Sequence, residues 1–178
     1  MKHLPVLLSL CATLAAQATE PAPRDRIERG RYLVNTSGCA DCHTPLKMGP
    51  RGPEPDAMRR LAGHPEGLAM PPVPSLPAGP WLVISSASNT AWAGPWGVSF
   101  TANLTPDPDT GLGRWSEQDF VQTLRHSRHL GQGRPLLPPK PTAYGEMSDA
   151  DLKAMFAYLM TLAPIRNRVP APLPPATR

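Results

Sequence analysis

The sequence predicts an all-α domain of three to four helices, interrupted by a long proline-rich loop insertion. Three segments, near residues 25–34, 116–129 and 148–163, place apolar side chains at helical spacing. Residues 45–80 contain ten of the chain's 25 prolines and show no periodicity that would favour a helix or a strand. A chain of 178 residues has room for one ordinary domain built from these elements.

The N-terminus has the organisation of a secretory signal peptide over residues 1–18. Lys2 supplies a positive start, residues 4–16 are mostly apolar, and the sequence Ala-Gln-Ala that ends at Ala18 matches an A-x-A cleavage site. We therefore expect cleavage near Ala18 and export of the mature protein to the periplasm, with a short linker over residues 19–24.

The first predicted helix covers residues 25–34. Ile27, Leu33 and Val34 lie near one stripe of this helix. Gly30 costs about 1 kcal/mol relative to alanine inside a helix, a cost that usually reflects the close approach of another helix. We expect the last helix of the chain to be that partner.

The segment that follows contains a motif with a specific chemical meaning. Cys11 leaves with the signal peptide, so the exported chain keeps Cys39 and Cys42, which are directly followed by His43. This C-x-x-C-H pattern is the attachment signature of c-type haem. Two thiols on one helical turn can bond the two vinyl groups of one porphyrin edge, and the next imidazole reaches the iron. We therefore expect one covalent haem c, attached through Cys39 and Cys42, with His43 as the proximal iron ligand.

Other uses of two cysteines fit this sequence less well. A disulfide is the ordinary expectation in an oxidising compartment, but it gives no role to the adjacent histidine. A thioredoxin-like redox pair needs a preceding strand in a βαβ unit, and neither is visible. A structural zinc site needs a second ligand pair, which His64, His126 and His129 do not supply at metal spacing. We expect His64, within a Gly-His-Pro sequence, to be a surface turn residue.

Residues 44–115 are expected to be mostly loop. We expect the proline-rich stretch over residues 45–80 to form a belt across the domain. Residues 91–97 contain two tryptophans, which we expect to pack either on a haem edge or on the domain core. Residues 101–113 have the proline, aspartate and glycine content of turns.

A further helix is predicted to begin at Ser116, because Asp119 three residues later gives a capping-box pattern. Phe120, Val121 and Leu124 form its apolar side. Its C-terminal end is crowded with cations that suit the helix dipole, namely Arg125, His126, Arg128 and His129.

The last helix is predicted to begin at Ser148, with Asp151 in a similar capping position, and to be ended by Pro164. Its apolar face consists of Leu152, Met155, Phe156, Leu159 and Leu162. Residues 164–178 are expected to form a proline-rich tail.

Composition and charge exclude several function classes. The formal net charge of +4 comes without the run of lysines and arginines that would favour nucleic acid binding. Beyond the signal peptide no apolar run reaches the ~20 residues that cross a membrane, so we expect no transmembrane segment in the mature chain. No acid–base pair, nucleophile triad or phosphate-binding loop is visible, so we expect no catalytic residues and no enzymatic activity.

Several segments together resemble a known family. Besides the C-x-x-C-H motif, they are residues 30–33, 92–97, 103–107, 134–139 and 167–170. Over about residues 25–170 the chain is similar to bacterial exported mono-haem class I c-type cytochromes, including the cytochrome subunits of periplasmic dehydrogenases.

The resemblance implies a cytochrome c-like fold around one haem, which we place over residues 25–163. It also implies electron transfer, either as a carrier or as the electron-accepting subunit of a dehydrogenase. The expected partner is a redox protein such as a periplasmic dehydrogenase or a respiratory-chain acceptor.

The sequence departs from this family at the distal iron ligand. Members typically have a methionine after a Pro-Pro pair, whereas this chain has Lys140 there. A lysine must lose its proton to coordinate iron, which costs about 4–5 kcal/mol at pH 7 from a pKa of about 10.4. Burial beside neighbouring prolines and bonding to iron could offset this cost. Met147 is the next candidate, although it also suits a hydrophobic staple with Leu152.

The remaining alternatives stay open at this point. Met48, Met58 and Met70 lie in the long loop, and His126 or His129 would need the 116–129 helix to turn its charged end inward. An iron without a distal protein ligand is the last possibility. A six-coordinate iron favours electron transfer, whereas an open iron favours the alternative function, a haem ligand-binding or peroxidase-like protein.

Overall fold

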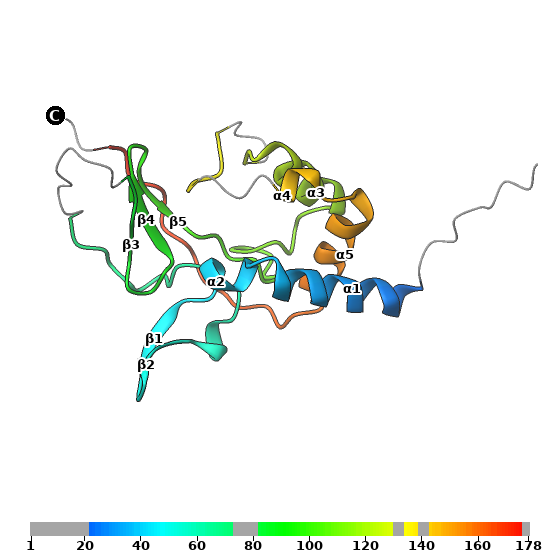
Figure 1. Ribbon diagram of the computed structural model, residues 1–178, viewed down its shortest axis with the longest axis horizontal. Coiled ribbons are helices and arrows are strands. Elements are labelled where there is room, and N and C mark those ends of the chain that lie inside the picture. The colour runs from blue at the N-terminus through cyan, green and yellow to red at the C-terminus, as the bar shows by residue number, and fades with distance from the viewer. Residues whose placement is uncertain (1–21, 73–81, 130–133, 139–142, 176–178) are drawn as a thin grey trace, which may run out of the picture.

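The computed structural model describes residues 22–72, 82–129, 134–138 and 143–175. The longer helices lie on one side of the short helix α2, and two small sheets lie on the other (Figure 1). The helices are α1 (Pro23–Thr36), α2 (Cys39–His43), α3 (Glu117–His126), α4 (Ala143–Glu146) and α5 (Asp149–Leu159), with a single 3₁₀ turn η1 (Ala57–Arg59). The strands are β1 (Leu46–Gly49), β2 (Gly52–Pro55), β3 (Ile84–Ser85), β4 (Ala91–Gly94) and β5 (Gly97–Phe100).

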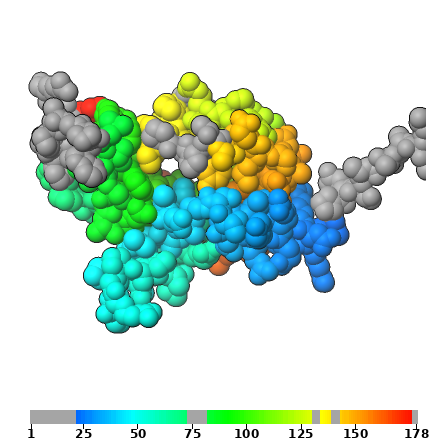
Figure 2. Space-filling view, viewed as in Figure 1, coloured from blue at the N-terminus to red at the C-terminus, as the bar shows by residue number. Residues whose placement is uncertain are grey.

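The prediction of an all-α fold is wrong, because part of the proline-rich stretch forms an antiparallel hairpin. In β1 and β2, Leu46 lies opposite Pro55 and Met48 lies opposite Pro53. The two prolines are tolerated because each strand of a two-stranded sheet is an edge, where a missing N–H removes no bond from the ladder. Gly52, with a φ of 114°, closes the turn. This hairpin projects from the body of the protein instead of forming a belt around it (Figures 1 and 2).

The second sheet also lies in a region expected to be loop. It has the strand order β3-β4-β5, and its hairpin contains the two tryptophans. Trp96 packs its ring over Gly94 at the hairpin turn, and the enclosed indole N–H groups of Trp92 and Trp96 have no acceptor among the described residues. Val98 of β5 exchanges two backbone hydrogen bonds with Leu173, which adds the C-terminal segment to the edge of this sheet.

The hydrophobic core lies between α1, α3 and α5. Val34 of α1 and Leu152 of α5 are fully enclosed, and Val121 of α3 is 2% exposed. Burial of each such side chain contributes about 1.5–3 kcal/mol. The core cluster consists of Leu33, Val34, Leu61, Leu112, Phe120, Val121, Leu152, Met155, Phe156 and Leu159.

The predicted starts of α3 and α5 are confirmed, whereas α1 extends two residues beyond its predicted range at each end. Ser116 caps α3, and its side chain and that of Asp119 form a reciprocal capping box. Ser148 caps α5 by accepting a hydrogen bond from the Asp151 N–H at 3.1 Å. Both starts depend on contacts within four residues, which explains why the sequence alone identifies them.

The predicted end of the last helix is wrong by several residues. α5 ends at Leu159, well before Pro164. The N–H of Thr161 bonds to the carbonyl of Tyr158 at 2.9 Å, so the chain tightens into i→i+3 bonding before the proline is reached. Pro164 therefore follows the helix end and does not cause it.

The close approach expected at Gly30 is confirmed. Gly30 is buried in α1 and lies directly against the backbone of Ala154 in α5. A β-carbon at Gly30 would overlap the Ala154 carbonyl group and the side chain of Tyr158. The glycine thus allows the two helix backbones to touch. In the part of the chain that the structure describes, no helix is both long and apolar enough to cross a membrane.

We predict that Gly30→Ala lowers the free energy of unfolding by about 2–3 kcal/mol, because the added methyl group meets backbone that cannot rotate away. Gly67→Ala is the matched control, since a β-carbon there meets no atom within 4 Å. Denaturant titrations of the two variants and the wild type test this. Equal midpoints for Gly30→Ala and Gly67→Ala would contradict the prediction.

Candidate haem site

The C-x-x-C-H motif forms a helix of its own, directly after α1. Gly38 has a φ of 77°, a conformation that favours glycine, and it reverses the chain between α1 and α2. Cys39, Cys42 and His43 then lie on the single helical turn of α2. The structure therefore brings together the three residues predicted to bind haem.

Both thiols of α2 are free and half-buried. Burial raises the pKa of the Cys39 thiol, and burial together with the Asp41 charge raises the pKa of Cys42. At neutral pH both sulfurs are therefore protonated.

His43 is held in one orientation by a backbone acceptor. Its Nδ1 atom lies 2.7 Å from the carbonyl oxygen of Ala102. Because a carbonyl can only accept, Nδ1 carries the proton and Nε2 keeps its lone pair. Burial lowers the pKa of His43, which favours the neutral imidazole. A neutral imidazole with a free Nε2 and a bonded Nδ1 is the form that ligates iron, so the residues fit a haem.

The Ala102 carbonyl is positioned by neighbours on both sides. The N–H of Thr101 donates to Thr90 at 2.9 Å, and the N–H of Leu104 donates to Leu61 at 2.8 Å. The Asn103 amide donates to the carbonyl of Ile165 at 2.7 Å, which ties this loop to the segment after α5. The acceptor of His43 is therefore held in place by hydrogen bonds on both sides.

The prediction that His64 is a surface turn residue is wrong, because its ring is fully buried. Nδ1 lies 2.9 Å from the Thr90 hydroxyl, and Nε2 lies 3.0 Å from the carbonyl of Leu68. The ring also packs against Phe100, with 4.7 Å between centroids. Gly63, with a φ of 75°, turns the chain inward at this point. A Gly-His-Pro sequence does not indicate to which side its imidazole points.

His64 also lies next to the loop that carries Ala102, the hydrogen-bond acceptor of His43. The N–H of Gly63 donates to the His43 carbonyl at 2.8 Å, and the N–H of His64 donates to Thr101 at 3.0 Å. Asn167, itself buried, donates from its amide to the carbonyls of Ala62 and His64 at 2.7 and 2.8 Å. The loop around His64 therefore connects α2, the 101–105 loop and the C-terminal segment.

Tyr144 of α4 is a contact of this site that the sequence analysis missed. Its hydroxyl donates to the carbonyl of Ser37, and it lies near enough to the Cys39 thiol to influence the pKa of that group. Burial, and the proximity of Cys39, raise the pKa of Tyr144 well above its ordinary value. No pattern in the sequence distinguishes Tyr144 from an ordinary half-buried tyrosine.

The candidates for the distal iron ligand differ in how far they are exposed to solvent. Lys140 lies outside the described residues. Met147 is half-buried and packs against the helical core. Met48 and Met58 are 77% and 83% exposed, so they project into solvent.

The other distal candidates are also described. Met70 is half-buried. His126 is exposed, and its Nε2 lies 2.9 Å from the Gln122 amide oxygen. His129 is half-buried at the end of α3.

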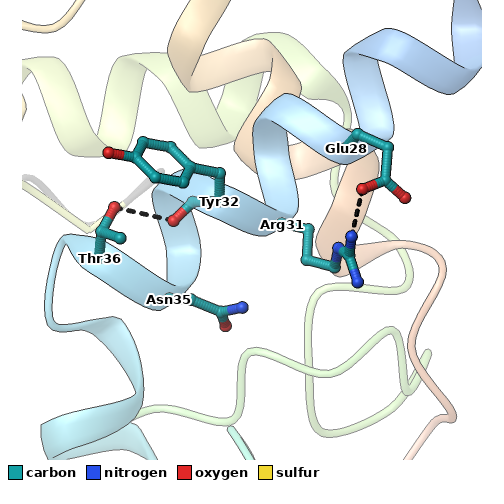
Figure 3. Close-up of a pocket in the computed structure, with 5 residues that line it drawn as sticks. All are labelled: Glu28, Arg31, Tyr32, Asn35 and Thr36. Carbon is teal, nitrogen blue, oxygen red and sulfur yellow. Dashed lines mark hydrogen bonds and ion pairs between the residues drawn. The ribbon is translucent and has the colours of Figure 1, made fainter.

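Two surface hollows lie outside the haem-binding residues. One of about 250 Å³ follows the outer face of α1, where Glu28 and Arg31 form an ion pair beside Tyr32 (Figure 3). The other, of about 300 Å³, lies between α2 and the β1–β2 hairpin. Among the described residues no group of three or more histidines, cysteines or carboxylates is arranged to hold a metal ion.

Comparison with known proteins decides the family. The family model for cytochrome c matches residues 27–163. The chain belongs to the cytochrome c family. Membership of this family supports electron transfer through haem iron.

Relatives of this cytochrome include named subunits of bacterial dehydrogenases, as the resemblance predicted. It is 33% identical over 146 residues to a nicotinate dehydrogenase subunit of Pseudomonas putida, covering 82% of this chain and 9% of that protein. It is 33% identical to the fructose dehydrogenase cytochrome subunit of Gluconobacter japonicus, covering 88% of this chain and 26% of that protein. It is 30% identical to the gluconate 2-dehydrogenase cytochrome c subunit of Pantoea cypripedii, covering 90% of this chain and 28% of that protein. The chain thus spans between about a tenth and three tenths of the length of these relatives.

We predict that the buried His64 makes stability depend on pH. Burial lowers the pKa of His64 in the folded state below the ordinary value of about 6.5, so the unfolded chain binds a proton first. Stability is therefore lost as pH falls through about 6.5 toward the folded-state pKa. At pH 7, His64→Gln should cost about 1–3 kcal/mol through its broken hydrogen bonds.

Urea titrations between about pH 5 and pH 7.5 test this. The expected result is that the free energy of unfolding falls more steeply with acidification in the wild type than in His64→Gln. His126→Gln is the matched control, because it makes the same substitution at an exposed histidine. Parallel pH profiles for the wild type and His64→Gln would contradict the prediction.

Proposed function

We propose that this cytochrome transfers electrons in the periplasm through one covalent haem c, bound by Cys39 and Cys42 and ligated by His43. The main support is the geometry of α2. Both thiols and the imidazole lie on one turn, and the 2.7 Å contact to Ala102 leaves Nε2 of His43 without a proton. The single C-x-x-C-H motif in the sequence supports one haem.

Each residue has a separate role in this proposal. The haem, when bound, supplies an iron that takes up and releases one electron. The thiols of Cys39 and Cys42 hold the group covalently, so it stays attached in an exported protein. The Ala102 carbonyl fixes the ring plane of His43 and increases its basicity as a ligand. Burial keeps that imidazole neutral.

We infer export from the N-terminal sequence. Residues 1–18 act as the signal peptide, cleaved near Ala18, and residues 19–24 as a linker. Residues 25–163 form the haem domain and residues 164–178 a proline-rich tail. A covalent haem suits this location, because it cannot be lost to the surrounding medium.

The inferred partner is a dehydrogenase, for which this cytochrome accepts electrons as a subunit or a separate carrier. Support comes from the relatives, three of which are named as subunits of nicotinate, fructose and gluconate dehydrogenases. A respiratory-chain acceptor would then receive the electron. The net charge of +4 would favour encounter with an acidic partner surface at low salt.

The distal ligand proposed for this haem is Lys140, with Met147 as the alternative. An amine is a harder ligand than a thioether and favours ferric iron, so it lowers the potential. If neither residue binds, the iron has an open position. That state would support the second candidate function, a haem ligand-binding or peroxidase-like protein. The reason to consider this function is that Lys140 stands where the family typically has its methionine ligand.

We predict that the wild type, expressed with a haem-attachment pathway, carries one covalent haem and that the Cys39→Ser/Cys42→Ser double variant carries none. The pyridine haemochrome spectrum and haem staining on a denaturing gel measure this. Cys11→Ser is the matched control, since Cys11 lies in the predicted signal peptide and should leave haem content unchanged. Covalent haem in the double variant, or its absence from the wild type, would refute the proposed function.

We predict that Lys140→Met raises the midpoint potential by about 0.1 V, part of the roughly 0.8 V range that axial ligands span. Potentiometric titration measures this, with Lys47→Met on the exposed hairpin as a charge-matched control. An unchanged potential would exclude Lys140 as the ligand. A high-spin ferric spectrum of the wild type would instead favour the ligand-binding function.

A further inference from the structure

Arg125 joins α3 to the junction between α4 and α5. Its Nη1 atom donates to the carbonyl oxygens of Gly145 and, at 2.8 Å, Met147. Its Nη2 atom donates to the carboxylate of Asp149. A single guanidinium therefore satisfies two backbone acceptors and one side chain at the point where α4 ends and α5 begins.

Tyr144 fastens the same short helix to the haem-binding turn. Its hydroxyl donates to the carbonyl of Ser37, which lies at the junction of α1 and α2, two residues before Cys39. α4 is thus attached by Arg125 to α3 and by Tyr144 to the residues around Cys39. Figure 1 shows α4 beside α3, on the helical side of the molecule.

α4 needs these attachments because it has little other support. It is one turn long, and a helix of this length is not stable by itself. None of its residues is fully buried, and only Tyr144 packs against the hydrophobic core, where its side chain is half-buried. The contacts of Arg125 and Tyr144 therefore determine whether α4 keeps its place near Ser37 and Cys39.

We propose that Arg125 and Tyr144 are positioning residues that hold α4 as a wall beside Cys39, so that water and foreign ligands are kept from the haem site. The inference rests on the proposed function, a haem attached at Cys39 and Cys42. Solvent access and the position of neighbouring groups affect the reduction potential of a haem iron. Release of α4 would therefore let ligands reach the iron more easily and would lower its midpoint potential.

The alternative is that Arg125 only adds general stability, and two variants separate these roles. Arg29 also anchors α5, through bonds of 2.9 and 3.3 Å to Asp151, but it does so from α1, and these bonds leave α4 untouched. Arg29→Gln therefore removes an ion pair of the same kind away from the wall. Asp149→Asn removes only the exposed end of the Arg125 contact and leaves both carbonyl bonds in place.

The experiment measures imidazole binding to the ferric, haem-loaded protein, together with its midpoint potential and its free energy of unfolding. Arg125→Gln should raise the apparent imidazole affinity about tenfold, as expected for losing a hydrogen bond to a charged group, and should lower the potential. Tyr144→Phe should raise the affinity about threefold, as expected for a neutral bond. Arg29→Gln and Asp149→Asn should bind imidazole as the wild type does.

The outcomes distinguish the inference from the function on which it rests. Covalent haem with the same imidazole affinity in Arg125→Gln and Arg29→Gln would overturn the wall and leave the proposed function intact. An effect of Asp149→Asn as large as that of Arg125→Gln would also overturn it, because the exposed ion pair would then be responsible. A wild type without covalent haem would overturn both. If Arg125→Gln does not fold, Tyr144→Phe provides the same test with a smaller structural change.

Discussion

The hydrogen bond from His43 to the Ala102 carbonyl joins the two halves of this protein. α2 follows directly from α1 and so belongs to the helical half, whereas Ala102 follows β5 and belongs to the sheet half. The orientation of the imidazole therefore depends on both halves being folded. The bonds from Gly63 to His43 and from Thr101 to Thr90 reinforce the same connection. In the proposed function, this bond also determines which nitrogen faces the iron.

Two of the segments that resemble the family, residues 103–107 and 167–170, have a common structural role. Asn103 bonds the 101–105 loop to Ile165, and Asn167 bonds the C-terminal segment to Ala62 and His64. Both amides are buried and fully used, so neither position tolerates a side chain without donors. Both side chains therefore support the position of Ala102.

Local patterns predicted the helices well and the rest of the fold poorly. The caps at Ser116 and Ser148 and the contact at Gly30 were predictable, because each follows from residues within one or two turns or from the cost of a glycine. The hairpin of β1 and β2 was missed because Pro53 and Pro55 interrupt any strand-like pattern, although both lie at an edge that tolerates them. The burial of His64 depends on Gly63 and on Thr90, which is 26 residues away.

The residues of the candidate site likewise fall into those that the sequence could predict and those that it could not. Cys39, Cys42 and His43 form a contiguous motif, so the sequence alone could place them on one turn. Arg125 appeared from sequence to be one of several cations at a helix end, and its bonds to Gly145 and Met147 become visible only in the folded structure. Side chains that act across 20 or more residues leave no local pattern to read.

The long separations within the site also set an order of assembly. In the proposed export the chain leaves the cell interior from its N-terminus, so the C-x-x-C-H motif emerges early. Its anchor at Ala102 lies 59 residues later, and the bond of Asn167 to Ala62 spans 105 residues. Loops of this length close slowly, because their entropy must be lost before any contact compensates for it. During export the two thiols are consequently accessible on an unfolded chain, and the scaffold that orients the imidazole closes around them last.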